Sequence, residues 1–459
     1  MKKNRKLLAA ALAVLLLAAA GWWGYNAWYE SRHVFIEEDV YPKDLESLDL
    51  RGTGVSLEYY EAVCSALPGC AVRYDLPFQG GFYADDTREL TITSLTEEEV
   101  ALLDYLPQLS RVYAEGCRDY AQLQALQARR PECRVSYTLE ILGEEYPHDT
   151  AQLSFEAETP SVAELETALA WMPDLESVTL MQPEMAAEDL LRLCVQYSDV
   201  RFFWEKDALG STYTSDVTEI DLSGRRDLTL EQVEQELRYF PALEKVLLCE
   251  CGYDNETMAA FREKMRPEYK VVWSMNIYGI TVRTDDTYFM PIKHGVSEIG
   301  DYQLQQLIYC EDMLCVDVGH MAVRKLDWVT GMPHLKYLIV ADGPLVYIDP
   351  LSTCKELVYL ELFDTHVSDF TPLLGCTALE DLNVADTYGD EMVFKDMPWL
   401  KNLWINRNGV TQAEHDELQA ALPNTRIESK HGFITGNGWR QVENYFKMRD
   451  LLGMPYNRW

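Results

Sequence analysis

Three aspartates stand at a fixed interval near the C-terminal end of the sequence and could hold a cation. Asp342, Asp364 and Asp386 are 22 residues apart, and Arg407 ends the series. If consecutive repeats stack, neighbouring carboxylates lie about 4.8 Å apart, the spacing of adjacent strands. Like charges at that distance repel each other, so the carboxylates must face water, accept local hydrogen bonds or share a cation such as Ca²⁺. Local hydrogen bonding is the commoner role of turn aspartates. The series is therefore a weak candidate metal site, and we expect no cofactor.

Catalytic motifs are missing from the sequence. It contains no Gly-x-Ser-x-Gly, His-Glu-x-x-His, P-loop or strand-linked Gly-x-Gly-x-x-Gly pattern. The eight histidines are scattered, and among 75 carboxylates some pair always resembles an acid–base dyad. We therefore predict no catalytic residue and a protein that is not an enzyme.

Side chains that alternate with buried residues along a repeated strand are the best candidates for ligand binding. Aromatic rings beside carboxylates and amides are typical of recognition surfaces, and they suit a protein, peptide or glycan ligand. The alternative is that these rings pack against one another or under a hairpin from the N-terminal half. The candidates are Asp317, Tyr337, Tyr359, Glu361, Phe363, Asp381, Asn383, Trp404 and Asn406.

A repeat of 22 residues must position these side chains. The pattern Leu-x-x-Leu-x-Val/Leu/Ile begins at Leu335, Leu357, Leu379 and Leu400, and one step earlier it begins at Met313. The alternation at its end predicts a short strand with one buried face. A period of this length is too short for two helices, but it fits one strand and a tight return.

A longer unit of about 66 residues recurs in the N-terminal half. Its marker is a glycine followed by Tyr or Val three residues later and by Asp six residues later. We interpret the marker as a β-hairpin inserted into the stack, because Gly and Asp supply turn conformations. The aspartates form a second column with the same alternatives as the first. The markers begin at Gly80, Gly143, Gly210 and Gly279, and their aspartates are Asp86, Asp149, Asp216 and Asp285.

Residues 313–410 resemble the 22-residue leucine-rich repeats of bacterial extracytoplasmic proteins of the internalin type. The likeness lies in the L-x-x-L-x-L strands and in return segments such as 367–373. The Asn/Cys position of the consensus holds Gly343, Thr365, Thr387 and Asn408, so only one of the four is standard. Residues 45–290 resemble the family more loosely. The resemblance implies an α/β repeat solenoid, a leucine-rich-repeat-like array with β-hairpin insertions in its N-terminal half.

The same resemblance implies a function. The expected protein is a non-enzymatic cell-surface binding module that recognises a protein, peptide or glycan through the concave face of the solenoid. The alternative is a structural or assembly component of the cell envelope with no discrete ligand. The net charge of −35 repels phosphate backbones, so nucleic acid is not an expected partner.

The N-terminus predicts a membrane segment. Four basic residues within positions 2–6 precede an uncharged stretch, and residues 7–25 are long enough to cross about 30 Å of hydrocarbon. Basic residues stay on the cytoplasmic side, so a single-pass protein with a cytoplasmic N-terminus and an extracytoplasmic body follows. A cleaved signal peptide and a secreted body is the alternative.

The predicted domains follow from these patterns. They are a signal anchor or signal peptide (1–29), a long-repeat region (30–290), a short-repeat region (291–429) and a C-terminal cap (430–459). The cap carries apolar positions such as Trp439 and Tyr445 and ends in Tyr456 and Trp459. The eleven cysteines are an odd number, and we expect most of them to be buried as small apolar residues.

Overall fold

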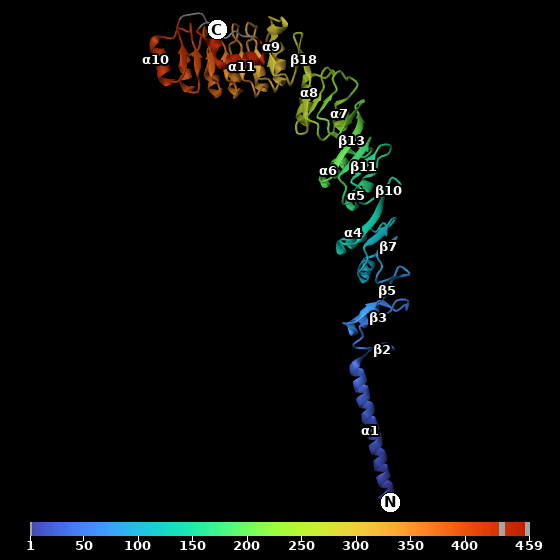
Figure 1. Cartoon of the computed structure of the whole chain (residues 1–459). Coiled ribbons are helices and arrows are strands. Elements are labelled where there is room, and N and C mark those ends of the chain that lie inside the picture. The colour runs from blue at the N-terminus through green and yellow to red at the C-terminus, as the bar shows by residue number, and fades with distance from the viewer. Residues whose placement is uncertain (1, 431–436, 455–459) are drawn as a thin grey trace. The chain divides into compact units, whose positions relative to one another are not determined.

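The computed structural model describes residues 2–430 and 437–454, and the chain folds into two compact units, residues 1–204 and 205–459 (Figure 1). Tyr456, Trp459 and the start of the predicted cap lie outside the described residues.

The first unit repeats one theme: a strand, a helix and a parallel strand. Its elements are α1 (Lys2–Arg32), β1 (His33–Ile36), β2 (Asp39–Pro42), β3 (Ser47–Asp49), α2 (Leu57–Ala66), β4 (Ala71–Arg73), β5 (Asp75–Phe78), β6 (Gly81–Ala84), β7 (Glu89–Thr91), α3 (Glu97–Leu102), η1 (Leu103–Tyr105), β8 (Arg111–Ala114), α4 (Tyr120–Arg129), β9 (Arg134–Ile141), β10 (Glu144–Pro147), β11 (Gln152–Phe155), α5 (Val162–Trp171), β12 (Ser177–Met181), α6 (Ala187–Gln196) and β13 (Arg201–Ala208).

The helix α1 contains the predicted membrane segment. Among the described residues, Ala10–Arg32 is a helical stretch long and apolar enough to cross a bilayer. Length and composition support this reading of α1, which suits a signal anchor or a signal peptide equally.

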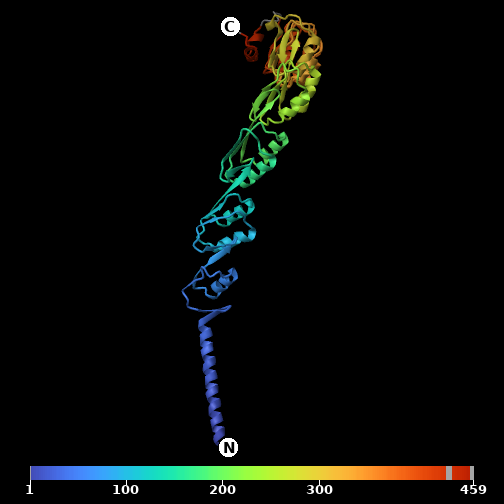
Figure 2. The ribbon, with the colours of Figure 1, turned by 90° about the vertical axis from the view of Figure 1, so that its right-hand side faces the viewer.

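The second unit continues the theme once and then becomes an array of short repeats. Figure 2 shows its strands side by side, with the C-terminal helix lying against them. Its elements are β14 (Ser211–Thr214), β15 (Glu219–Asp221), α7 (Leu230–Leu237), β16 (Lys245–Leu247), α8 (Asn255–Met265), β17 (Lys270–Val272), β18 (Ser274–Ile277), β19 (Ile280–Arg283), β20 (Tyr288–Phe289), η2 (Pro291–His294), α9 (Asp301–Leu304), η3 (Gln305–Tyr309), β21 (Cys315–Asp317), η4 (Asp327–Gly331), β22 (Tyr337–Ile339), η5 (Asp349–Thr353), β23 (Tyr359–Glu361), η6 (Thr371–Gly375), β24 (Asp381–Asn383), η7 (Glu391–Asp396), β25 (Asn402–Trp404), α10 (Gln412–Ala421), β26 (Arg426–Glu428), η8 (Trp439–Gln441) and α11 (Glu443–Leu451).

The predicted hairpins are present in the long repeats. Four antiparallel pairs, β5–β6, β9–β10, β13–β14 and β18–β19, are joined by two-residue turns. Both turn residues have positive φ, for example Leu142 (53°) and Gly143 (78°), as the favoured hairpin turn requires. Each hairpin interrupts the parallel stack, so the N-terminal sheets stay small: β7–β9 and β15–β17 each contribute three parallel strands. The glycine marker of the long unit therefore encodes the turn.

Helices of the long repeats begin at capping residues that the sequence provides. The hydroxyl of Thr96 accepts a hydrogen bond from Glu99 N, and the Glu99 carboxylate accepts one from Thr96 N. Ser161 and Glu164 form the same reciprocal pair at the start of α5. Such capping boxes satisfy backbone donors that a helix start leaves unpaired.

The short repeats form a seven-stranded parallel sheet in the order β20 to β26. Residues 22 apart are direct partners: Leu338 lies opposite Leu360, and Leu360 lies opposite Leu382. Single 3₁₀ turns, η4 to η7, replace the helices as return segments. The predicted repeat, its register and its strand positions are confirmed.

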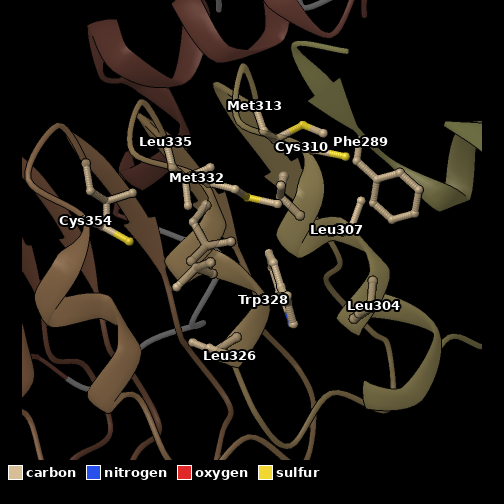
Figure 3. Close-up of a cluster of buried hydrophobic side chains, with 14 of the residues drawn as sticks. Phe289, Leu304, Leu307, Cys310, Met313, Leu326, Trp328, Met332, Leu335 and Cys354 are labelled. Atoms are coloured by element: carbon tan, nitrogen blue, oxygen red, sulfur yellow. The ribbon is translucent and has the colours of Figure 1, made fainter. Parts of the chain in front are cut away.

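One face of this sheet packs against the return segments and forms a continuous apolar core. Figure 3 shows part of it, where Leu335 and Met332 lie near Trp328 of η4 and Leu307 of η3. Trp328 is 1% exposed, and Leu307 and Leu335 are fully buried. A repeat of this length cannot bury its apolar face alone, so stacked neighbours complete the core.

Candidate functional site

The candidate site is the other face of the seven-stranded sheet, which we call the inner face. Because side chains alternate along a strand, Tyr359 and Glu361 project opposite to Leu360. The register aligns Tyr337, Tyr359 and Asp381 in one column. It aligns Asp317, Ile339, Glu361, Asn383 and Trp404 in the next column. The structure thus brings the predicted site residues onto one face.

Side chains that bind a ligand from solution would be exposed to solvent on this face. That expectation is wrong. Tyr359 is 1% exposed, Trp404 2% and Phe363 3%, and the Glu361 carboxylate is fully enclosed. Tyr337, Asp381, Asn383 and Asn406 are also buried, while Asp317 is partly buried. The cover is the chain's own residues 437–454, which we call the C-terminal segment, and not a hairpin of the N-terminal half. Whether these residues bind a ligand remains a prediction.

The C-terminal segment lies across the strands, not at the end of the array (Figures 1 and 2). This position differs from the expected end cap. The last edge of the array is instead formed by α10 and β26, which pairs with β25. Apolar side chains explain the docking, because burying each ring or aliphatic chain stabilises the contact by roughly 1.5–3 kcal/mol.

Aromatic side chains make the central contacts between the two parts. Trp439 packs edge-on against Phe363, with ring centroids 5.2 Å apart. Tyr445 lies 6.2 Å from Tyr359 and 6.4 Å from Trp439 by the same measure. Such pairs contribute about 0.5–1.5 kcal/mol beyond the area that they bury.

A buried ionisable cluster lies at the centre of the inner face. Glu361 accepts a hydrogen bond from the Tyr359 hydroxyl, and its other oxygen lies 3.5 Å from Arg440 Nη2 of the C-terminal segment. Burial raises the pKa of Glu361 to about 8, an effect that the Arg440 charge and the Tyr359 hydrogen bond partly offset. Burial also raises the pKa of Tyr359. The cluster gives the segment a polar contact beside the aromatic rings of the interface.

A second polar contact holds α11 at the next strand. Asn444 Nδ2 donates to Asp381 Oδ2 and Glu380 Oε2, both at 2.9 Å. Asn402 Nδ2 donates to the other Asp381 oxygen at 2.6 Å. Burial raises the pKa of Asp381, and these two amide donors oppose the shift.

Backbone carbonyls anchor both ends of the C-terminal segment. At its start, Asn437 O accepts hydrogen bonds from Arg426 Nη2 (2.8 Å) and Trp404 Nε1 (3.3 Å). At its end, Leu452 O accepts one from Lys293 Nζ at 2.6 Å. Asn406 Nδ2 donates to Lys430 O at 2.6 Å, just before the segment.

Within the part of the chain that the structure describes, two buried donors of the interface have no partner. Neither Asn383 Nδ2 nor Trp439 Nε1 has a hydrogen bond to a described residue, although both atoms are enclosed. An unsatisfied buried polar group costs about 1–3 kcal/mol. The C-terminal segment therefore fits the inner face well in shape but incompletely in hydrogen bonding.

The aspartate column occupies the turn that follows each strand of the array. Asp342, Asp364 and Asp386 all have φ between 52° and 58°, the left-handed region that Asp tolerates better than most residues. His320 Nδ1 lies 2.6 Å from Asp342, and Arg407 Nη1 lies 3.2 Å from Asp386. Burial and the two neighbouring carboxylates raise the pKa of Asp364. The three aspartates thus share the same turn geometry. Whether they hold a cation stays a prediction.

The second aspartate column makes local contacts at the hairpins. Asp86 pairs with Arg73 at 2.6 Å, Asp149 with Arg134 at 3.2 Å, and Asp285 with Arg283 at 2.7 Å. Asp216 accepts a hydrogen bond from Thr214 Oγ1 at 2.5 Å. Within the described residues, no group of three or more His, Cys, Asp or Glu side chains is arranged to hold a metal ion.

The cysteines lie mostly in the interior of the protein and form no disulfide with one another. All eleven are free thiols, and most are buried, including Cys310, Cys354 and Cys376 in the apolar core. Burial raises the pKa of Cys310 to about 12, which keeps the thiol protonated and unreactive. Cys249 and Cys251 follow the end of β16 and are not part of the strand.

Sequence reasoning missed the residues of the C-terminal segment that complete the site. Arg440 and Asn444 face Glu361 and Asp381, but they follow no repeat pattern. The available signal was the spacing of Tyr445 and Met448 on one face of a short helix, with the apolar Trp439 just before it.

Comparison with solved structures finds leucine-rich-repeat proteins. The chain is similar to internalin C2 of Listeria monocytogenes, with 15% identity, a TM-score of 0.27, and 49% of this chain and 87% of that chain covered. It is similar to internalin F of the same species, with 14% identity, a TM-score of 0.25, and 89% and 88% covered. A leucine-rich-repeat protein of Leptospira interrogans gives 11% identity, a TM-score of 0.27, and 73% and 93% covered.

The chain resembles internalin-like leucine-rich-repeat proteins, and the parallel register of β20 to β26 carries the fold assignment by itself. No family model matches the sequence. No curated protein matches it either.

Proposed function

We propose that this protein is a membrane-anchored, extracytoplasmic binding protein that recognises a protein or peptide through the inner face of its array. In the docked form of the chain, the C-terminal segment occupies that face as an intramolecular ligand. The helix α1 serves as the signal anchor, with the basic residues at its start in the cytoplasm.

The composition of the inner face carries this proposal. It buries Glu361, Asp381, Asn383 and Asn406 among aromatic rings, whereas the opposite face of the same strands buries apolar side chains. Buried polar groups add little stability compared with apolar packing, but they discriminate between partners. A surface that served only as a core would not need them.

A peptide supplied in trans tests the proposal. The full-length protein in detergent would carry Trp439→Ala and Tyr445→Ala, which remove two rings that hold the C-terminal segment. We expect a fluorescent peptide of residues 437–454 to bind this variant, as measured by anisotropy, and to bind the unchanged protein much more weakly. A peptide with Arg440→Glu is the matched control, because it places a carboxylate against Glu361.

The burial of the inner face favours a second candidate, a structural component of the cell envelope with no discrete ligand. In that case the C-terminal segment is a permanent part of the core. Failure of the peptide to bind the doubly substituted protein, with the array still folded by circular dichroism, would contradict recognition and support this second function.

A further inference from the structure

A cavity of about 190 Å³ remains between the inner face and the C-terminal segment. On the array side, Asp317, Ile339 and Phe363 line it. On the segment side, Arg440, Tyr445 and Met448 line it. The cavity exists only while the segment is docked, because each side supplies part of the wall.

Small residues of two successive repeats create this space. Gly319 and Ala341 occupy the column position that Phe363 fills in the next repeat, where its ring packs against Trp439. A Cβ atom at Gly319 would lie 3.3 Å from Ile339 Cγ2 and 3.4 Å from Asp317 Oδ1, so a larger side chain here would take up space beside the cavity. Residue size thus leaves a pocket at the first two repeats and closes it at the third.

The cavity has charged groups of opposite sign in its walls. Asp317 Oδ1 accepts a hydrogen bond from Gly319 N at 3.1 Å. Among the described residues, no ion pair joins the Asp317 carboxylate to Arg440. Arg440 Nη2 lies 3.5 Å from Glu361, and the guanidinium group stacks over the Trp439 ring. The Arg440 side chain is nevertheless 45% exposed.

Arg449 and His320 also line the cavity, and Arg449 adds positive charge near Asp317. His320 is paired with Asp342 outside the pocket. Apolar groups, including Met290, Ile339 and Met448, cover the remaining wall. The walls therefore present one carboxylate, the guanidinium groups of Arg440 and Arg449, and an apolar surface.

We propose that this cavity binds a small zwitterion, a free α-amino acid with a compact apolar side chain. The ligand ammonium pairs with the Asp317 carboxylate, and the ligand carboxylate accepts hydrogen bonds from the Arg440 guanidinium. The apolar side chain lies against Ile339 and Met448. This inference goes beyond the proposed function, because it requires a docked segment and not a displaced one.

Binding of such a ligand stabilises the docked state, since the ligand contacts both walls. An amino acid would thus act against release of the inner face. The two proposals are linked in this way but can fail separately.

Isothermal titration calorimetry on the full-length protein in detergent tests the inference with three matched probes. L-valine carries both charges, 3-methylbutanoate lacks the ammonium, and isobutylamine lacks the carboxylate. We expect L-valine to bind at least about tenfold more tightly than either half-molecule, since each lost charge-assisted contact is worth at least that factor.

Three variants locate the site. Asp317→Asn should weaken L-valine binding about tenfold or more. Ala341→Leu should fill the cavity and abolish binding. Asp349→Asn, a change to an exposed carboxylate on the return segment η5, away from the cavity, should leave binding unchanged and serves as the control. Thermal melts of all three would verify that the array is folded.

The outcomes separate the possibilities. Absence of heat with L-valine at millimolar concentration would overturn the inference, as would equal binding of 3-methylbutanoate or insensitivity to Asp317→Asn. Binding of L-valine together with failure of the trans peptide would uphold the amino-acid site and reject the displaceable segment.

Discussion

The two faces of the seven-stranded sheet are packed in different ways by the same short strands. Leu338, Leu360 and Leu382 point into an apolar core that the return segments close. One position away, Tyr359, Glu361 and Asp381 meet the C-terminal segment. The first interface is built from every repeat, whereas the second depends on the C-terminal segment, which contains η8 and α11.

This difference separates stability from recognition. Apolar packing is non-directional, and stacked repeats supply it generally. Buried carboxylates are costly unless a specific partner satisfies them. The inner face therefore depends on the identity of its occupant, and we expect it to separate before the apolar core does.

The largest effect should come from Leu360→Ala. Leu360 is 1% exposed in the apolar core, and its truncation should lower the free energy of unfolding of the array by roughly 2–5 kcal/mol. Denaturant unfolding followed by circular dichroism measures this change. A loss below about 1 kcal/mol would mean that the core collapses around the cavity and that the array is not a single packed body.

Trp439→Ala should act on the other face and only locally. Trp439 is 1% exposed and packs against Phe363, so its removal should lower the free energy of segment opening by about 3 kcal/mol. Hydrogen exchange of α11 should accelerate, while the unfolding midpoint of the array stays nearly constant. Tyr347→Ala, at a 64% exposed ring, is the control. If the substitution lowered the stability of the array as much as that of the docked segment, the two faces would not be energetically separate.

Docking of the C-terminal segment should weaken as pH rises. Burial raises the pKa of Glu361 from 4.5 to about 8, so the docked state holds a proton that the open state releases. The contribution is complete below pH of about 4.5 and is lost as pH rises through about 8. Its size is of the order of a few kcal/mol, and the raised pKa values of Asp317 and Asp381 act in the same direction.

Hydrogen exchange of α11 across this pH range, corrected for intrinsic rates, measures the effect. Glu361→Gln should flatten the profile, because the amide cannot ionise. A profile that keeps its slope in this variant would assign the pH dependence to another group.

The smallest effect should come from Asp364→Asn, on the turn edge that belongs to neither face. The substitution removes a carboxylate between Asp342 and Asp386, and Asn tolerates the left-handed φ of 52°. We expect stabilisation of no more than about 0.5 kcal/mol in a denaturant titration. Strong destabilisation, or a Ca²⁺-dependent melt that the substitution abolishes, would instead indicate a cation site.

The sequence predicted the array well because its signal is periodic. Leucines 22 apart became direct strand partners, and the glycines of the long unit became hairpin turns with positive φ. Periodicity also placed Tyr359, Glu361 and Trp404 on one face correctly. These features depend on repeated local patterns, which can be read directly from one amino-acid sequence.

Exposure of the inner face could not be predicted in the same way. The apolar positions Tyr445 and Met448 indicate a helix that must bury one side. Packing against the edge of the sheet would bury that side as well as packing against the inner face does. The choice depends on side-chain pairs such as Arg440 with Glu361, which are far apart in sequence and occur once. No repeat reveals such a pair.

The C-terminal segment belongs to the same chain as the surface that it covers, so a free partner competes against a tethered one. A tethered segment acts at an effective concentration in the millimolar range. A partner making the same contacts would therefore need to reach that concentration, or to satisfy the unpaired donors of Asn383 and Trp439 better than the segment does. Covalent connection thus sets a threshold: weak and scarce binders are rejected, and only an abundant or better-matched partner gains the inner face.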